Sequence, residues 1–320
     1  MAILITGGTG FIGTQLARLA VDEGLRPLLL DPVPPGPAMA DLVPAVDYLP
    51  NSLNSTSSLV EILRSRGVDI IFHLGGMLSV PSERDPWAAF EVNINGTQRL
   101  LEAARLCGIK RFVFASSIAV YGRDLPTGPV NEASVEHPAS MYGLCKVSCE
   151  LLGMFHHHRF GLDFRAIRVP SVVGPGSKVP HMSIYNCWAI ERPLQGQPYE
   201  IFVEPQTRCP VIYFRDAARA LWELSRAPEA DLETRIYNVV GVRPSFSAQE
   251  LADAVRAQVP SASLSFTPDP EISRMMSQVG QMELDDTRAR REWGWRAGYD
   301  LPGIVAQFIA DYHAGNSKTE

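Results

Sequence analysis

Short apolar runs alternate with longer amphipathic segments along the first 170 residues. The apolar runs are rich in Val, Ile, Leu and Phe and lack polar alternation, which predicts strands that are buried on both faces. The predicted strands are 2–6, 26–31, 46–50, 69–75, 111–117 and 162–169, and the helices between them are 12–24, 56–66, 87–107 and 141–159. Buried strands separated by helices indicate a parallel sheet covered on both sides, a doubly wound α/β fold of the Rossmann type.

The pattern changes after Val169. The segment PSVVGPGSKVP (170–180) predicts a loop because it holds three Pro and two Gly residues. Irregular segments follow, and then a helix at 214–226, a strand at 235–241, and helices at 247–258 and 302–313. We expect residues 1–170 and 211–240 to form the sheet-bearing domain, and 171–210 and 241–320 to form a smaller, mixed α/β C-terminal lobe for the substrate.

Composition and charge narrow the class of protein. A chain of 320 residues with 46% hydrophobic residues can bury a large core. The net charge of −6 without a basic run argues against nucleic acid and anionic membranes as partners, and no apolar stretch approaches the ~20 residues that span a bilayer. The N-terminus shows no signal peptide, and five cysteines without a CxxC pair fit a reduced protein. We therefore expect a soluble cytoplasmic protein that acts on a small molecule.

Three glycines directly follow the first predicted strand, as Gly7, Gly10 and Gly13 in ILITGGTGFIG. A tight turn needs a residue without a Cβ, and a close approach to a pyrophosphate needs a second one. The N–H groups at the start of the next helix, around Phe11 and Ile12, would then face the anion. The pattern predicts a dinucleotide-binding loop, and the alternative is a tight turn that holds no ligand.

The second predicted strand ends in Asp31, 18 residues after Gly13. An acidic residue at this place can accept hydrogen bonds from the ribose 2′-hydroxyl of the adenosine, and it would repel a 2′-phosphate. The following PVPPGPAM offers no Arg or Lys to hold such a phosphate. NAD is therefore favoured over NADP, unless Asp31 only forms the turn before Pro32.

Ser116 and Ser117 end the fifth predicted strand, where ligands bind in open α/β sheets. Tyr142 and Lys146 lie one turn apart on the same face of the helix 141–159. A tyrosine phenol ordinarily titrates near ~10, so it needs nearby positive charge to act as a base at neutral pH. We predict that Tyr142 deprotonates an alcohol, that Lys146 assists it, and that Ser117 holds the substrate oxygen. The YxxxK spacing by itself also fits a packed helix face.

Five segments together resemble the extended short-chain dehydrogenase/reductase family, also called the NAD-dependent epimerase/dehydratase family: TGGTGFIG, IIFHLGG, NINGTQRLLEAAR, SSIAVYG and YGLCK. The resemblance implies the Ser117–Tyr142–Lys146 triad and NAD as the cofactor. Members are commonly homodimers, which implies that helices 87–107 and 141–159 pair across an interface. With the glycine loop, the residues expected at NAD are Asp31, Leu74, Gly75, Gly76, Ser116, Tyr142, Lys146 and, through its backbone, Pro170.

The resemblance also bears on the substrate. Sugar-nucleotide epimerases usually carry an Asn where this chain has Ser171, whereas MLS (77–79) and DDTRARREWGWRAGYDL (285–301) resemble the L-threonine 3-dehydrogenase-like branch and similar dehydrogenases of four-carbon sugar acids. That branch implies substrate contacts by Ser79 and fits Arg208. Its amino-acid-binding segment corresponds to KVPHMSIYN (178–186), which has no acidic residue for an ammonium group. A hydroxy acid, sugar acid or β-hydroxy acid without an amine fits at least as well as threonine.

Three functions follow from these patterns. The first is an NAD-dependent dehydrogenase that oxidises a secondary alcohol on a small polar substrate. The second is a nucleotide-sugar epimerase or dehydratase with tightly bound NAD, and the third is a regulator that binds a dinucleotide without catalysis. We expect no metal site, because the three histidines 156–158 are ~100° apart around a helix and suit a solvated or interface helix end. Trp293 and Trp295 are expected to pack in the smaller lobe.

Overall fold

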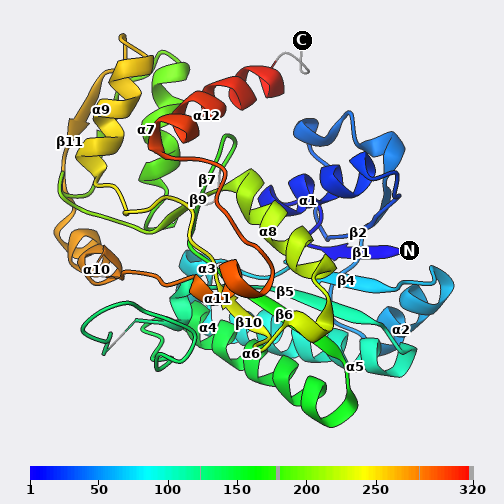
Figure 1. The fold of residues 1–320 in the computed structure, drawn as a ribbon. Coiled ribbons are helices and arrows are strands. Elements are labelled where there is room, and N and C mark those ends of the chain that lie inside the picture. The colour runs from blue at the N-terminus through cyan, green and yellow to red at the C-terminus, as the bar shows by residue number, and fades with distance from the viewer. Residues whose placement is uncertain (123, 178–180, 281, 317–320) are drawn as a thin grey trace.

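Seven parallel strands form the central sheet of the computed structural model, which describes residues 1–122, 124–177, 181–280 and 282–316 (Figure 1). The strands are β1 (Ile3–Thr6), β2 (Leu28–Leu30), β3 (Asp47–Leu49), β4 (Ile70–His73), β5 (Arg111–Ser117), β6 (Asp163–Val169) and β10 (Ile236–Asn238). Their order across the sheet is β10-β6-β5-β4-β1-β2-β3, and every pair is parallel. All seven strands that the sequence predicts for this sheet are present.

Helices cover both faces of the sheet, which confirms the doubly wound α/β fold. Helices α1 (Phe11–Asp22) and α8 (Phe214–Arg226) pack on one face, and α2 (Thr56–Ser65), α5 (Gly96–Cys107) and α6 (Met141–Phe160) pack on the other (Figure 1). Successive strand residues point to opposite faces. Accordingly, Ile5 lies in the core beneath α1 and α8, whereas Leu4 lies in the core beneath α2 and α5.

The predicted helix 87–107 is interrupted. It consists of α4 (Pro86–Ala89), a π-helical segment η3 (Phe90–Asn95) and α5. The wider turn coincides with Asn93, whose side chain turns away to bind the backbone of Met77. Helix α6 agrees with the prediction, because Ser140 caps its N-terminus by accepting the Gly143 N–H, and Gly161 ends it in a left-handed conformation at φ +72°.

A second hydrophobic core lies beside the sheet, around α7 (Tyr185–Leu194), α9 (Ala248–Gln258) and α12 (Leu301–Asn316) (Figure 1). The prediction of irregular structure after residue 170 was wrong for α7, which buries Tyr185, Cys187 and Ile190 although Pro193 lies in its last turn. Two short strand pairs lie outside the central sheet: β7 (Ser171–Val173) with β9 (Val211–Tyr213), and β8 (Tyr199–Ile201) with β11 (Leu264–Phe266). The remaining helices are α3 (Ser79–Arg84), α10 (Pro270–Gly280) and α11 (Thr287–Glu292). The 3-10 turns are η1 (Pro37–Met39), η2 (Val43–Ala45), η4 (Ile118–Val120) and η5 (Glu229–Asp231).

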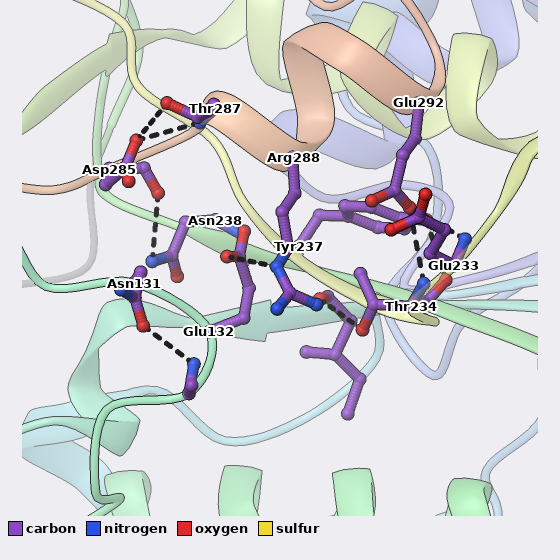
Figure 2. Close-up of polar contacts among 12 residues, drawn as sticks. Asn131, Glu132, Glu233, Thr234, Tyr237, Asn238, Asp285, Thr287, Arg288 and Glu292 are labelled. Atoms are coloured by element: carbon purple, nitrogen blue, oxygen red, sulfur yellow. Dashed lines mark hydrogen bonds and ion pairs between the residues drawn. The ribbon is translucent and has the colours of Figure 1, made fainter.

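Helix α11 returns to the sheet and packs beside β10. The Tyr237 hydroxyl donates to Glu292 over 2.6 Å, and the Asn238 N–H donates to Glu132 over 2.9 Å (Figure 2). Trp295 is fully buried in the core beneath α1 and α8, where its indole N–H donates to Val240 O. The expectation that Trp293 and Trp295 pack in the smaller lobe was therefore wrong. No helix in the described part of the chain has the length and apolar character needed to cross a membrane.

Candidate active site

A cleft of about 2330 Å³ runs along the carboxyl ends of the strands, beside the point where the chain leaves β1 and β4 in opposite directions across the sheet. Ligands bind at such switch points in open α/β sheets. Nearly all residues that the sequence singled out line this cleft. They are Gly7, Gly10, Phe11, Ile12, Gly13, Asp31, Leu74, Gly75, Gly76, Ser79, Ser116, Ser117, Tyr142, Lys146, Pro170 and Ser171.

The glycine loop between β1 and α1 has no room for side chains. Gly7 has φ +67°, and a Cβ on it would lie 2.7 Å from Gly75 N. A Cβ on Gly13 would lie 2.2 Å from Gly7 O. Gly10 is the extended N-cap of α1, and no side chain caps this helix. The loop therefore presents backbone alone at a helix N-terminus, an arrangement that fits a pyrophosphate.

Asp31 follows β2 at the wall of the cleft. One carboxylate oxygen accepts the Val33 N–H over 2.9 Å, and the other accepts the Thr9 N–H over 3.3 Å. Each oxygen keeps a further lone pair, so the carboxylate can also accept hydrogen bonds from a ribose. Both roles that the sequence suggested, turn formation and ribose recognition, are compatible with this geometry.

The loop after β4 is held against the glycine loop by a buried histidine. His73 Nδ1 lies 2.6 Å from Thr6 Oγ1, which accepts the Gly75 N–H, and Nε2 lies 2.8 Å from Thr97 Oγ1. Thr97 gives its own hydrogen to the Asn93 carbonyl, so Nε2 carries the imidazole hydrogen and Nδ1 accepts from Thr6. Complete burial, followed by the charge of Lys146, lowers the pKa of His73 to about 3, and the ring stays neutral.

Asn93 fixes the same loop from the other side. Its side-chain oxygen accepts the Met77 N–H over 2.7 Å, and its amide donates to Met77 O over 3.1 Å. A Cβ on Gly76 would lie 2.7 Å from that side-chain oxygen. No sequence pattern indicated this role of Asn93, because it depends on the π-helical turn in η3.

Ser117, Tyr142 and Lys146 meet at the carboxyl end of β5. The Lys146 ammonium is buried, donates to Ala115 O over 2.7 Å and lies 5.5 Å from the centre of the Tyr142 ring. Ser117 Oγ accepts the Ala119 N–H over 3.2 Å, which leaves its own hydrogen to donate. A Cβ on Gly143 would lie 2.1 Å from Ala119 O, so this glycine lets α6 approach the end of β5. A cation, a phenol and a hydroxyl donor therefore share one corner of the cleft.

Ser116 lies in the cleft wall, but its hydroxyl donates to Glu150 beneath the surface. Glu150 also binds Arg168, and both side chains are almost completely buried. Burial alone would lower the pKa of Arg168, but the hydrogen bonds and negative charge of Glu150 outweigh it and raise the pKa. The Ser116 hydroxyl thus joins β5 to α6.

The substrate end of the cleft combines hydroxyl groups with apolar side chains. Ser79, Ser171 and Ser183 lie there together with His181, and Met276 lines it from α10. Tyr185, which the sequence left open as a pocket residue, is buried in the second core. Among the described residues that line the cleft but were not singled out by the sequence are Glu83, Met182, Ser183, Val279 and Met282.

Arg208 is not brought to the cleft. Its guanidinium donates to Ser245 O and lies 3.2 Å from Glu250, at the start of α9. Arg208 therefore pairs with a carboxylate of α9 and lies apart from the other side chains that were predicted to contact substrate. The first three residues of the segment 178–186 lie outside the described residues, and His181, Met182 and Ser183 line the cleft.

The histidines and cysteines of α6 serve packing. His156 is buried, His157 Nδ1 lies 2.8 Å from Leu162 O, and only His158 of the three is exposed near the end of the helix. Cys145 and Cys149 are buried free thiols, and burial raises the pKa of Cys149 to about 11. Across residues 1–122, 124–177, 181–280 and 282–316, no group of three or more His, Cys, Asp or Glu side chains is placed to hold a metal ion.

Known proteins resemble this chain over most of its length. Residues 3–240 match the NAD dependent epimerase/dehydratase family. The mitochondrial L-threonine 3-dehydrogenase of Bos taurus is 30% identical over 99% of this chain and 83% of its own length. The holo form of an L-threonine dehydrogenase from Cupriavidus necator is 29% identical, covers 97% of this chain and 99% of its own, and superposes with a TM-score of 0.87.

A UDP-glucose 4-epimerase structure from Thermotoga maritima is 24% identical, covers 99% of this chain and 100% of its own, and has a TM-score of 0.85. That likeness shows the fold alone. The family match over most of the chain, together with the similarity to dehydrogenases, identifies the family. The chain belongs to the NAD-dependent epimerase/dehydratase family and is an NAD-dependent dehydrogenase of the extended short-chain dehydrogenase/reductase type.

Proposed function

We propose that this dehydrogenase oxidises, or in reverse forms, a secondary alcohol on a small hydroxy acid, sugar acid or β-hydroxy acid through Ser117, Tyr142 and Lys146. The observation that carries the proposal is the buried Lys146 ammonium 5.5 Å from the Tyr142 ring centre, in the corner that Ser117 shares. A buried cation beside a phenol stabilises the phenolate that a base needs.

NAD, when bound, supplies the hydride acceptor. The residues suited to hold it are the backbone of Gly7 to Gly13 at the pyrophosphate, Asp31 at the adenosine ribose, Leu74 to Gly76 along the dinucleotide, and Lys146 with Pro170 near the nicotinamide. Tyr142 then takes the proton of the substrate hydroxyl. Ser117 donates a hydrogen bond to the same substrate oxygen and aligns it with the phenol.

The substrate class follows from the groups at its end of the cleft. Hydroxyls of Ser79, Ser171 and Ser183 suit a small molecule rich in oxygen. The carboxylate of Glu83, which also lines the cleft, accepts the Met141 N–H at the start of α6. A hydroxy acid or sugar acid is favoured over threonine, because the described residues 181–186 contribute no acidic group for an ammonium.

The alternative is a nucleotide-sugar epimerase or dehydratase, which reduces and reoxidises NAD within one turnover. The size of the cleft favours it, since about 2330 Å³ exceeds the ~300–1,000 Å³ that a drug-sized ligand occupies. The dinucleotide itself accounts for much of this volume. Release of NADH separates the two functions, because an epimerase accumulates none.

The test is a panel of hydroxy acids, sugar acids, β-hydroxy amino acids and UDP-sugars with NAD, followed by NADH absorbance and by product analysis. We expect NADH release with a member of the acid groups. Tyr142→Phe should lower kcat/KM for that substrate by ~10²–10⁴ and leave the Kd of NAD within about threefold. Turnover of a UDP-sugar alone would reject the proposal in favour of the epimerase. A Tyr142→Phe protein with full activity would reject the assignment of the base.

Two further properties are proposed. We infer a homodimer that pairs helices 87–107 and 141–159, because apolar side chains are exposed along this face. They are Trp87, Phe90, Val92, Leu106, Leu144, Leu151, Phe155 and Phe160.

Five free thiols support a reducing compartment such as the cytoplasm.

A further inference from the structure

Three polar side chains form a hydrogen-bonded chain at the substrate end of the cleft. Ser171, two residues beyond the end of β6, donates its hydroxyl hydrogen to Ser183 Oγ over 2.6 Å. Ser183 Oγ in turn lies 3.1 Å from Nδ1 of His181. In the sheet, Val169 pairs with Ser117, so the chain starts just beyond the level of the proposed oxygen anchor. All three side chains line the cleft.

The hydrogens of this chain follow from its geometry. Ser183 accepts from Ser171 and has one hydroxyl hydrogen of its own, and the neighbouring acceptor for it is Nδ1 of His181. With Nδ1 as acceptor, a neutral imidazole carries its hydrogen on Nε2. Burial lowers the pKa of His181 to about 4, so the ring is neutral at pH 7. His181 is therefore an N–H donor without charge.

The surroundings of this N–H define what can bind it. Met182, next to His181 in the chain, lines the same cleft, as do Met276 and Val279 of α10, and Ile184 lies in the second core. A donor in such partly apolar surroundings requires an acceptor, and a negatively charged oxygen gives the strongest hydrogen bond. An ammonium group cannot meet this requirement, because it has donors only.

We propose that the Nε2–H of His181 donates a hydrogen bond to a carboxylate oxygen of the substrate, with Ser183 fixing the tautomer, so that the site selects substrates that carry a carboxylate. The inference rests on the proposed function in that the molecule recognised is the alcohol oxidised at Tyr142. It adds which chemical group is recognised and which residue recognises it.

Two variants of one position test this role. In His181→Gln the amide places an N–H near the former Nε2, whereas His181→Leu removes the donor. His158→Leu, at an exposed histidine on α6, is the control for replacing a histidine by a leucine. The two substrates compared are threonine and its dihydroxy analogue, 2,3-dihydroxybutyrate, which share a 3-hydroxyl and differ in the 2-substituent.

We expect His181→Leu to raise KM for the dihydroxy acid by about 10- to 100-fold, since a hydrogen bond to a charged group contributes ~1.5–3 kcal/mol. The turnover number should stay within about threefold, and His181→Gln should keep KM within about fivefold. KM for threonine should rise by a similar factor in His181→Leu, because threonine carries the same carboxylate. The affinity for NAD should match that of His158→Leu. An unchanged KM in His181→Leu would overturn the inference.

A measurement without turnover separates this inference from the proposed function. Binding of butyrate to the NAD-loaded protein, measured by calorimetry, should weaken at least tenfold in His181→Leu and little in His181→Gln. Nitrogen NMR should report an Nε2–H imidazole at pH 7. Equal butyrate binding in both proteins, or an Nδ1–H ring, would overturn the inference and leave the proposed function intact. Failure to oxidise any acid, with His181-dependent butyrate binding, would reject the proposed function and retain the carboxylate contact.

Discussion

The Asp31 carboxylate can serve two roles, turn formation and recognition of the adenosine ribose. Substitutions that remove its charge or its oxygens can distinguish the two roles. Both oxygens accept backbone N–H groups, from Val33 and Thr9. An amide at this position keeps one carbonyl oxygen for the turn but loses the negative charge and one acceptor. The charge is what disfavours a 2′-phosphate, whereas the turn needs only an acceptor.

We therefore predict that Asp31→Asn and Asp31→Ala both raise the Kd of NAD by about tenfold, which is the loss of ~1.4 kcal/mol of hydrogen bonding. The Kd of NADP should fall or stay constant, so the preference for NAD shrinks. Fluorescence titration with both cofactors measures this. If Asp31 only formed the turn, Asn would behave as the wild type and Ala would weaken both cofactors equally.

Gly7 requires both a left-handed backbone and an absent side chain. A Cβ would meet Gly75 N at 2.7 Å, so Gly7→Ala should push apart the two loops that line the cofactor cleft. We predict a loss of NAD affinity of more than 100-fold, together with a lower Tm. Gly67→Ala is the matched control, because Gly67 has φ +57° and no atom within 4 Å of the added Cβ. It should cost about 1–2 kcal/mol of stability and leave the Kd of NAD within twofold.

Residue types predicted the chemistry of the site better than the direction of each side chain. Ser116 and Ser117 are adjacent, yet the alternation of a strand sends the first hydroxyl to Glu150 and leaves the second at the cleft. Arg208 fits a family pattern, but its guanidinium forms an ion pair with Glu250. Such outcomes depend on partners that lie far away in the sequence.

At the scale of elements, apolar patterns predicted every strand of the central sheet and its main helices, because burial on both faces gives continuous apolar runs. The short elements were missed. Strands β7, β8, β9 and β11 have three residues each, and α3 has six, which is too short for periodicity to register. The π-helical turn of η3 also escaped prediction, since it is visible only through the contact of Asn93 with Met77.

The buried His73, at the end of β4, makes the free energy of unfolding depend on pH. Its pKa is about 3 in the folded protein and near 6.5 in the unfolded chain, so unfolding takes up a proton between these values. The stabilisation by the neutral ring is complete above pH 6.5 and is lost progressively as the pH falls toward 3. From pH 7 to pH 5 this one group removes about 2 kcal/mol from the free energy of unfolding.

We predict that His73→Gln loses less stability than the wild type between pH 7 and pH 5, by about 2 kcal/mol, although it is less stable at pH 7. Urea unfolding of the cofactor-free proteins at the two pH values measures the difference. His181, whose pKa burial also lowers, contributes equally to both proteins and cancels. Parallel losses in the two proteins would show that His73 is not the group that takes up the proton.

For the whole molecule, the functional cleft and the proposed dimer face are largely separate, although Val92 belongs to both. The cleft is lined at the carboxyl ends of the strands. The exposed apolar side chains instead follow α4, η3, α5 and α6, where Leu144, Leu151 and Phe155 share one helix face. Apolar area of this extent is unusual for the surface of a monomer.

The dimer can be tested by one charge on that face. Leu151 is 64% exposed, and Leu151→Glu would place a carboxylate opposite its own symmetry mate in a two-fold interface, where like charges repel. We predict that light scattering gives the mass of two chains for the wild type and of one chain for Leu151→Glu, with NAD binding retained because Leu151 does not line the cleft. Val135→Glu is the control, since Val135 is 69% exposed but lies outside both helices, and it should leave the dimer intact. A wild-type protein with the mass of one chain, or a Leu151→Glu protein that stays dimeric, would contradict pairing through these helices.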